Sequence, residues 1–230
     1  PVTINRYINV MKKLQKAIPD FYGKEDITFH ELNSDFIATF DLFLKTEAGL
    51  CRNTIVRYMK CFKRITNMAL AKEWMRKDPF YGYKMAQDET DPVFLTYPEL
   101  KSIMEKEFTI PRLALVRDIF VFAAFTGLAF ANVSTLTKDN LVQDNNGDWW
   151  IRKGRVKLER RHRASSVCNI PLLPVPLAIL KKYEEHPICR KKSLCLPVIC
   201  NQRMNSYLKE IADLCNIRKN LTTHTAKHSK

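Results

Sequence analysis

Hydrophobic residues recur every three or four positions in the first part of the chain, which is the spacing of amphipathic helices. The pattern predicts a helix over residues 4–18, ended by Pro19. A second helix is predicted to begin at Asn33 or Ser34, two residue types that cap helices, and to stop before Gly49. Each segment carries one apolar face, so each is expected to bury that face against another helix.

The longest helical pattern begins at Asn53 and Thr54 and runs until Asp78 and Pro79 break it. Together the segments predict a small bundle of three or four helices. The positions expected to be buried are Ile4, Ile8, Met11, Leu14, Ala17 and Ile18 in the first helix, Phe36, Ile37, Phe40, Phe43 and Leu44 in the second, and Ile55, Tyr58, Met59, Phe62, Ile65, Met68, Ala69 and Trp74 in the third.

A polar stretch with a glycine and a proline follows this bundle and predicts an exposed connector. We therefore expect a helical domain at residues 1–80, a linker at 81–95 and a second domain at 96–230. The second domain opens with Thr96 and Glu99, which have the spacing of a reciprocal capping box.

The second domain is predicted to combine helices with a small sheet. Residues 111–128 are almost continuously apolar after Arg117 and Asp118, which predicts a core helix that ends at Gly127. The segments 149–151 and 167–170 have strand-like patterns and indicate a small antiparallel sheet after a turn at 144–147. Helical spacing resumes over residues 177–183 and 204–215. The predicted fold class is mainly α, with a helical bundle followed by an α+β domain.

The net charge adds a class of partner to this picture. Lysine and arginine number 38 against 24 aspartates and glutamates, which gives a formal charge of +14. Such a balance favours a polyanionic partner, with nucleic acid first. No apolar run approaches the length that crosses a bilayer, and the first residues lack a signal-peptide pattern, so we expect a cytoplasmic protein without a membrane partner.

Seven cysteines occur without any C-x-x-C pair, which indicates free thiols in a reducing compartment. Zinc ligation by Cys189, Cys195, Cys200 and Cys215 is the alternative. Their spacings fit no common zinc module, so no metal site is expected.

The longest predicted helix carries polar side chains opposite its apolar stripe, and these suit contact with phosphates. An ordinary solvated helix face is the alternative interpretation. The candidate nucleic-acid-binding residues on this face are Arg52, Asn53, Thr54, Arg57, Tyr58, Lys60, Lys63 and Arg64.

Basic residues are densest between the two predicted strands, at residues 152–163. Glu159 is the single acid among them, and such a density of like charge repels itself unless a polyanion screens it. We therefore expect this segment to contact phosphate. Its cations are Arg152, Lys153, Arg155, Lys157, Arg160, Arg161 and Arg163.

Two histidines and a lysine lie close together near the end of the sequence. His224, Lys227 and His228 fall within one helical turn, so they could face a single phosphate. A basic tail with incidental histidines is the alternative.

Five segments in this order resemble the tyrosine recombinases of the phage integrase family, in particular the integrases of mobile elements from gut anaerobes. They begin at Arg52, Phe94, Phe125, Trp150 and Leu221. They are similar, in turn, to the long helix of a SAM-like core-binding domain, the opening of the catalytic domain, the box that carries the first catalytic arginine, the hairpin that carries the catalytic lysine, and the H-x-x-R box.

The resemblance implies site-specific DNA cleavage and rejoining through a 3′-phosphotyrosyl link, without a nucleotide cofactor or an obligatory metal. It also implies a double-stranded DNA partner and an active form that is a homo-tetramer on DNA and a monomer without it. In this family two arginines clamp the phosphate oxygens as charge builds, while a lysine and a histidine transfer protons.

Some positions depart from the family pattern. Lys157 matches the general acid, with Lys153 as the alternative because the stretch between the strands is long. His224 and Lys227 stand at the two ends of the H-x-x-R box, so a lysine replaces the second arginine. At the place of the first arginine stands Ala129, which carries no charge.

The nucleophilic tyrosine of the family lies well beyond the H-x-x-R box, so we expect a C-terminally incomplete chain that is inactive by itself. Tyr183 and Tyr207 are interpreted as core or helix-face aromatics. One alternative is a truncated or decayed relative that binds DNA without cutting it. Another is a basic helical scaffold or RNA-binding protein without recombinase ancestry.

Overall fold

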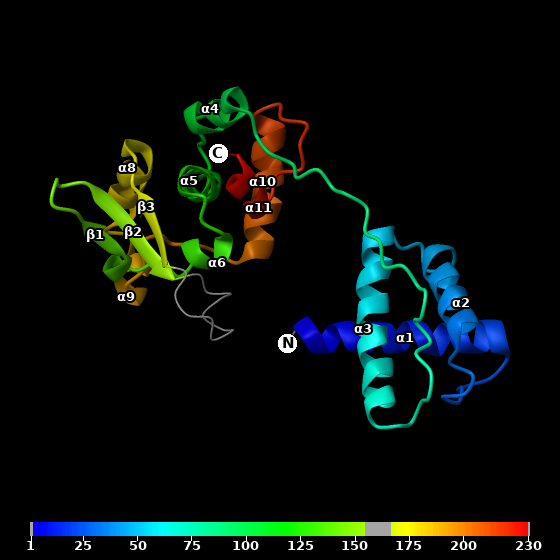
Figure 1. Cartoon of the computed structure of the whole chain (residues 1–230). Helices are drawn as coiled ribbons and strands as arrows, with labels where there is room; N and C mark the ends of the chain where they lie inside the picture. Colours follow the sequence, from blue (N-terminus) through cyan, green and yellow to red (C-terminus); the bar gives the residue numbers. More distant parts are fainter. Residues whose placement is uncertain (1, 155–166, 230) are drawn as a thin grey trace. The chain divides into compact units, whose positions relative to one another are not determined.

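The computed structural model describes residues 2–154 and 167–229 (Figure 1). The chain divides into two compact units, Pro1–Thr90 and Asp91–Lys230. The first is helical, and the second combines helices with a three-stranded sheet, so the predicted mainly α fold class is confirmed. Within the described ranges, no helix is both long and apolar enough to cross a membrane.

The first unit is a three-helix bundle made of α1 (Val2–Tyr22), α2 (Ser34–Lys45) and α3 (Arg52–Ala71). Each helix contacts the other two, and α1 crosses both α2 and α3 (Figure 1). The predicted cap of α2 is confirmed, because the side chain of Asn33 accepts a hydrogen bond from the amide of Phe36 at 3.0 Å.

Phenylalanine rings form the centre of the first unit. The ring of Phe62 packs edge to face against Phe40 at 5.7 Å and against Phe80 at 5.6 Å. Phe80 follows α3 in the sequence, so the chain beyond this helix returns to the core. Edge-to-face pairs add stabilisation to the burial of apolar area.

The prediction that Pro19 ends the first helix is wrong, because α1 continues to Tyr22 with the proline inside it. Tertiary packing holds this last turn. The ring of Tyr22 stacks on Phe36 at 5.5 Å, and Phe21 meets Phe43 edge to face at 6.0 Å. These contacts offset the hydrogen bond that proline cannot donate.

Burial was over-predicted in the first half of α1 and in and after the second half of α3. Ile4, Ile8 and Met11 of α1 are exposed, as are Ile65, Met68 and Trp74 in and after α3. The helix α3 also ends at Ala71 and not at Pro79, because Glu73 adopts a left-handed backbone conformation with φ of 59°.

The second unit is built around one helix, α5 (Pro111–Thr126), as Figure 1 shows. Its residues from Asp118 to Ala124 are all buried. The helices that pack on α5 are α4 (Tyr97–Glu105), α6 (Phe130–Val133), α8 (Pro174–Tyr183), α10 (Asn201–Leu214) and α11 (Thr223–His228), and α9 (Pro187–Lys192) lies between α8 and α10 in sequence.

Two predicted helix boundaries of this unit are confirmed. Thr96 caps α4, and its amide donates to the carboxylate of Glu99 at 2.7 Å, as in a capping box. The helix α5 ends at Gly127, which has φ of 65°. Glycine suits this position because it carries no Cβ to clash in the left-handed conformation.

The sheet is antiparallel with the strand order β1 (Leu141–Gln143), β2 (Trp149–Gly154) and β3 (Val167–Pro171). The central residue Ile151 is buried and pairs with Leu141 and Ile170. The strand β1 was not predicted, because three residues are too few to show alternation. The predicted turn at 144–147 is the connection between β1 and β2.

We expect Phe40→Ala to destabilise the protein by about 3–5 kcal/mol, because it opens a cavity within the ring cluster. The matched control is Leu42→Ala in the same helix, where the side chain is 53% exposed and the expected cost is below about 0.5 kcal/mol. Urea unfolding of the full chain measures both. Equal costs would show that the ring cluster does not hold the bundle together.

Candidate nucleic-acid interface

The polar face of α3 presents three cations to solvent. Arg57, Lys60 and Arg64 are exposed and lie three or four residues apart, which places them on one face of the helix. The ammonium of Lys60 donates to the side-chain oxygen of Gln87 at 3.2 Å. This face therefore offers two guanidinium groups and one ammonium group to an anionic partner.

Arg52 and Asn53 at the start of α3 bind protein groups in this structure. The guanidinium of Arg52 donates to the backbone carbonyls of Lys84 at 3.0 Å and Ala86 at 3.2 Å, and to the carboxylate of Asp41 at 3.1 Å. The side chain of Asn53 donates to the carbonyl of Asp88 at 3.0 Å and accepts from its amide at 2.9 Å. Both residues thus fasten the returning chain to α3.

The carboxylate of Asp41 binds a second side chain in addition to Arg52. It also accepts a 2.5 Å hydrogen bond from the hydroxyl of Tyr83. Burial and the neighbouring carboxylate raise the pKa of Tyr83 to about 12. Arg52, Asp41 and Tyr83 therefore form one network that joins α2, α3 and the segment after Phe80.

The remaining predicted residues of α3 are half-buried. Thr54 lies with its hydroxyl 3.2 Å from the sulfur of Cys51, and Tyr58 packs against the core. The ammonium of Lys63 lies 3.7 Å from the carboxylate of Asp78 and 5.7 Å from the ring centre of Phe80. These side chains are less accessible to a partner than Arg57 and Arg64.

On the sheet, the structure describes two of the predicted cations. Arg152 is exposed on β2. The ammonium of Lys153 donates to the carbonyl of Thr135 at 2.6 Å and to the side chain of Asn140 at 2.9 Å. Arg155, Lys157 and Arg160 lie outside the described residues.

The short helix α11 turns its basic side chains outward. Thr225 and Ala226 are buried, whereas His224, Lys227 and His228 are exposed. The Nε2 atoms of His224 and His228 lie 3.1 Å apart. The sequence placed these three residues within one turn, and the helix confirms that geometry.

Hydrogen bonds fix α11 in place on both sides. The hydroxyl of Ser229 accepts from the amide of Leu95 at 2.8 Å and donates to the carbonyl of Thr225 at 2.9 Å. Thr223 bonds through its amide and its hydroxyl to the side chains of Asn205 and Asn201 in α10. The orientation of the basic face is therefore set by the core of the unit.

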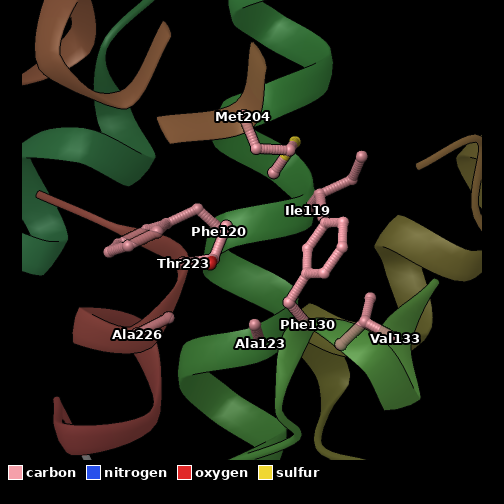
Figure 2. Close-up of a pocket in the computed structure, with 8 residues that line it drawn as sticks. All are labelled: Ile119, Phe120, Ala123, Phe130, Val133, Met204, Thr223 and Ala226. Atoms are coloured by element: carbon pink, nitrogen blue, oxygen red, sulfur yellow. The ribbon is translucent and has the colours of Figure 1, made fainter. Parts of the chain in front are cut away.

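A small cavity of about 10 Å³ lies where α5, α6, α10 and α11 meet (Figure 2). Its walls include Phe130 and Ala226, the sequence neighbours of Ala129 and Lys227. The packing thus brings the start of α6, with Ala129 as its N-terminal cap, and the helix α11 around the same end of α5. The cavity is too small for more than one water molecule.

Tyr183 is part of a buried polar cluster. Its hydroxyl donates at 2.8 Å to Asp118, which also accepts from Arg117 at 2.6 Å and from Lys182 at 2.7 Å. Burial and the adjacent carboxylate raise the pKa of Tyr183 well above its ordinary range. Tyr207 lies with its ring centre 5.1 Å from the guanidinium carbon of Arg112. Both tyrosines therefore have structural surroundings, as predicted.

Comparison with known proteins places this architecture in a recognised class. Residues 1–85 match the phage integrase SAM-like domain family. The full chain superposes on the XerH site-specific recombinase bound to its difH substrate, with a TM-score of 0.70 and 16% identity over 99% of this chain and 67% of that one. The chain has the tyrosine recombinase fold. No curated protein sequence matches it.

Two further tyrosine recombinases superpose on the chain as well. A lambda integrase dimer bound to a COC′ core site gives a TM-score of 0.71 at 14% identity, over 99% of this chain and 77% of that one. The Tn1549 transposon integrase bound to transposon right end DNA gives 0.65 at 17% identity, over 100% and 79%. The predicted resemblance is thus confirmed at the level of the fold, and a basic scaffold of some other fold is excluded.

The Arg52–Asp41–Tyr83 network predicts a specific alkaline response. The pKa of Tyr83 in the folded protein, about 12, lies above the ordinary value of 10.0. Stability from this phenol is therefore fully present below pH 10 and is lost as the pH rises towards 12. We expect Tyr83→Phe to reduce the loss of stability across that window, as measured by urea unfolding at each pH.

Asp41→Asn provides the companion test. Removing the carboxylate charge should lower the ionisation midpoint of Tyr83, followed by ultraviolet absorbance of the phenolate relative to Tyr83→Phe. An unchanged midpoint would mean that the charge of Asp41 does not act on this phenol.

Proposed function

We propose that this chain binds double-stranded DNA as part of a site-specific tyrosine recombinase of a mobile element. The observation that carries the proposal is that the family match and an exposed basic surface fall on the same helix of the first unit. The segment that matches the phage integrase SAM-like family contains α3, whose solvent face bears Arg57, Lys60 and Arg64. A net charge of +14 and the DNA-bound state of XerH and lambda integrase support it.

The proposed DNA binding has an electrostatic basis. Cations that neutralise DNA phosphates release condensed counterions, and this release dominates affinity at moderate salt. The exposed guanidinium groups of Arg57 and Arg64 suit phosphate contact, because a planar fork can meet two oxygens at once. Arg52 and Asn53 would act differently, by holding the segment 84–88 against α3. Arg152, Lys227 and His224 would supply contacts from the second unit.

We further propose that this chain does not complete strand exchange by itself. In the recombinase reaction a tyrosine oxygen bonds to phosphorus while the 5′-oxygen leaves and takes a proton. Negative charge builds on the non-bridging oxygens, where arginine forks stabilise it. Ala129 offers no charge there, and Lys227 offers a point charge. Lys157, or Lys153 in its place, would protonate the leaving oxygen.

The second candidate function is DNA binding without cleavage, by a decayed relative that occupies recombination sites. Ala129 and Lys227 favour it, because both replacements remove a guanidinium while leaving the basic surfaces intact. In either case we propose a homo-tetramer on DNA, with no cofactor.

We expect tight, salt-sensitive binding to duplexes from the ends of the chain's own element, and weaker binding to scrambled duplexes, as measured by fluorescence anisotropy. Arg57→Ala and Arg64→Ala should each weaken binding to every duplex and reduce the salt slope by about one. The matched control is Lys24→Ala, because Lys24 is exposed in the same unit but pairs with Glu31. An equal effect of all three variants would contradict a DNA-binding role for the α3 face.

A second measurement addresses the chemistry. A nicked duplex that traps cleavage should give no covalent protein–DNA product with this chain, because the arginine forks are missing. Denaturing gel electrophoresis detects such a product directly. A covalent band that survives denaturation would show that this chain cuts DNA and would overturn the second part of the proposal.

A further inference from the structure

The histidine pair on α11 has a geometry that the predicted contact with a phosphate would not require. His224 and His228 are four residues apart on one helix face, and both are exposed. Their Nε2 atoms are 3.1 Å apart, and their ring centres are 4.6 Å apart at an interplanar angle of 81°. The Nε2 edges of the two rings therefore face one another.

That separation matches the distance between two nitrogen ligands of one metal ion. Imidazole nitrogens bind zinc at about 2.0–2.1 Å. Two such bonds at an angle between 90° and 110° place the nitrogens about 2.9–3.4 Å apart. The observed 3.1 Å lies within this interval. We infer that His224 and His228 form a two-nitrogen binding site for a divalent transition-metal ion.

The chemical class of the ion follows from the donors. Neutral imidazole suits zinc, nickel, cobalt and copper, whereas magnesium and calcium prefer oxygen ligands. Among the described residues, no group of three or more potential ligands surrounds this pair. The described residues would thus supply two ligands, and water would fill the coordination positions that no other group occupies.

Metal binding changes the tautomer of one imidazole ring. In the neutral pair one Nε2–H donates to the lone pair of the other Nε2. When the ion binds, the donating ring moves its proton to Nδ1, so that both Nε2 lone pairs coordinate the metal. The hydrogen bond between the rings is lost, and two metal–nitrogen bonds form.

The support beneath the pair is rigid. Thr225 and Ala226 anchor α11 in the core, and Ser229 ties the helix to the amide of Leu95. The backbone that carries the two ligands is therefore held in place, which limits the entropy lost on binding to that of the side-chain rotamers. The ammonium of Lys227 lies on the same short helix and opposes the charge of the ion, so the affinity should be moderate.

Cobalt(II) is a suitable probe, because its absorption spectrum distinguishes nitrogen from thiolate ligands. We expect one site in calorimetric titration of the full chain and visible bands without a thiolate charge-transfer band. His224→Ala and His228→Ala should each weaken binding by about tenfold or more, because either variant loses the chelate. The matched control, His30→Ala, removes an exposed histidine from the first unit and should leave binding unchanged.

Three results would overturn the assignment: no binding by the full chain, equal binding by the control and the two pair variants, or a thiolate band from one of the seven cysteines. Circular dichroism verifies that each variant is folded.

A measurement without substitutions gives an independent answer. Sub-stoichiometric cobalt should broaden the ring proton signals of His224 and His228 before those of His30 and His186, and the reverse order would contradict the site. The inference stands apart from DNA binding, which none of these measurements uses.

Discussion

The burial of α5 is the constraint on which the second unit depends. This helix packs against five other helices, so its residues from Asp118 to Ala124 have no solvent-facing side. An unpaired carboxylate at Asp118 would be strongly destabilising there. Arg117, Lys182 and Tyr183 surround it and satisfy its oxygens. The end of α5 then fixes α6 and α11, and with them Ala129 and the basic face of His224 and Lys227.

Much of the fold was predictable because local signals and tertiary packing agree. The caps at Asn33 and Thr96, the glycine that ends α5 and the apolar stripe of α2 are all encoded within a few residues. Predictions failed where packing at a distance decides the outcome. The helix α1 continues past Pro19 because Tyr22 stacks on a ring of α2. The strand β1 exists because β2 offers it a partner, and its three residues carry too little pattern to reveal it.

The candidate site also combines features that local sequence predicts with features that distant contacts decide. The sequence assigned eight residues of α3 to nucleic-acid binding, and the structure separates them by what they bind. Arg52 and Asn53 contact residues 32 to 35 positions away, a return of the chain that no helical pattern contains. Arg57 and Arg64 face solvent. Lys157, Arg155 and Arg160 lie outside the described residues, so their roles remain predictions. The pairing of His224 with His228 follows from their spacing of four, but the 3.1 Å separation depends on the rotamers.

Binding a polyanion and accelerating its cleavage place different demands on positive charge. Binding needs many cations at approximate positions, because counterion release depends on their number more than on their geometry. Cleavage needs a few donors held where charge develops, and a guanidinium meets that demand better than an ammonium because its fork is planar and permanently charged. Under the function that we propose, a basic chain with Ala129 and Lys227 would keep the first property and lose the second. The DNA binding that we propose can therefore persist without strand exchange, because binding and cleavage depend on different residues.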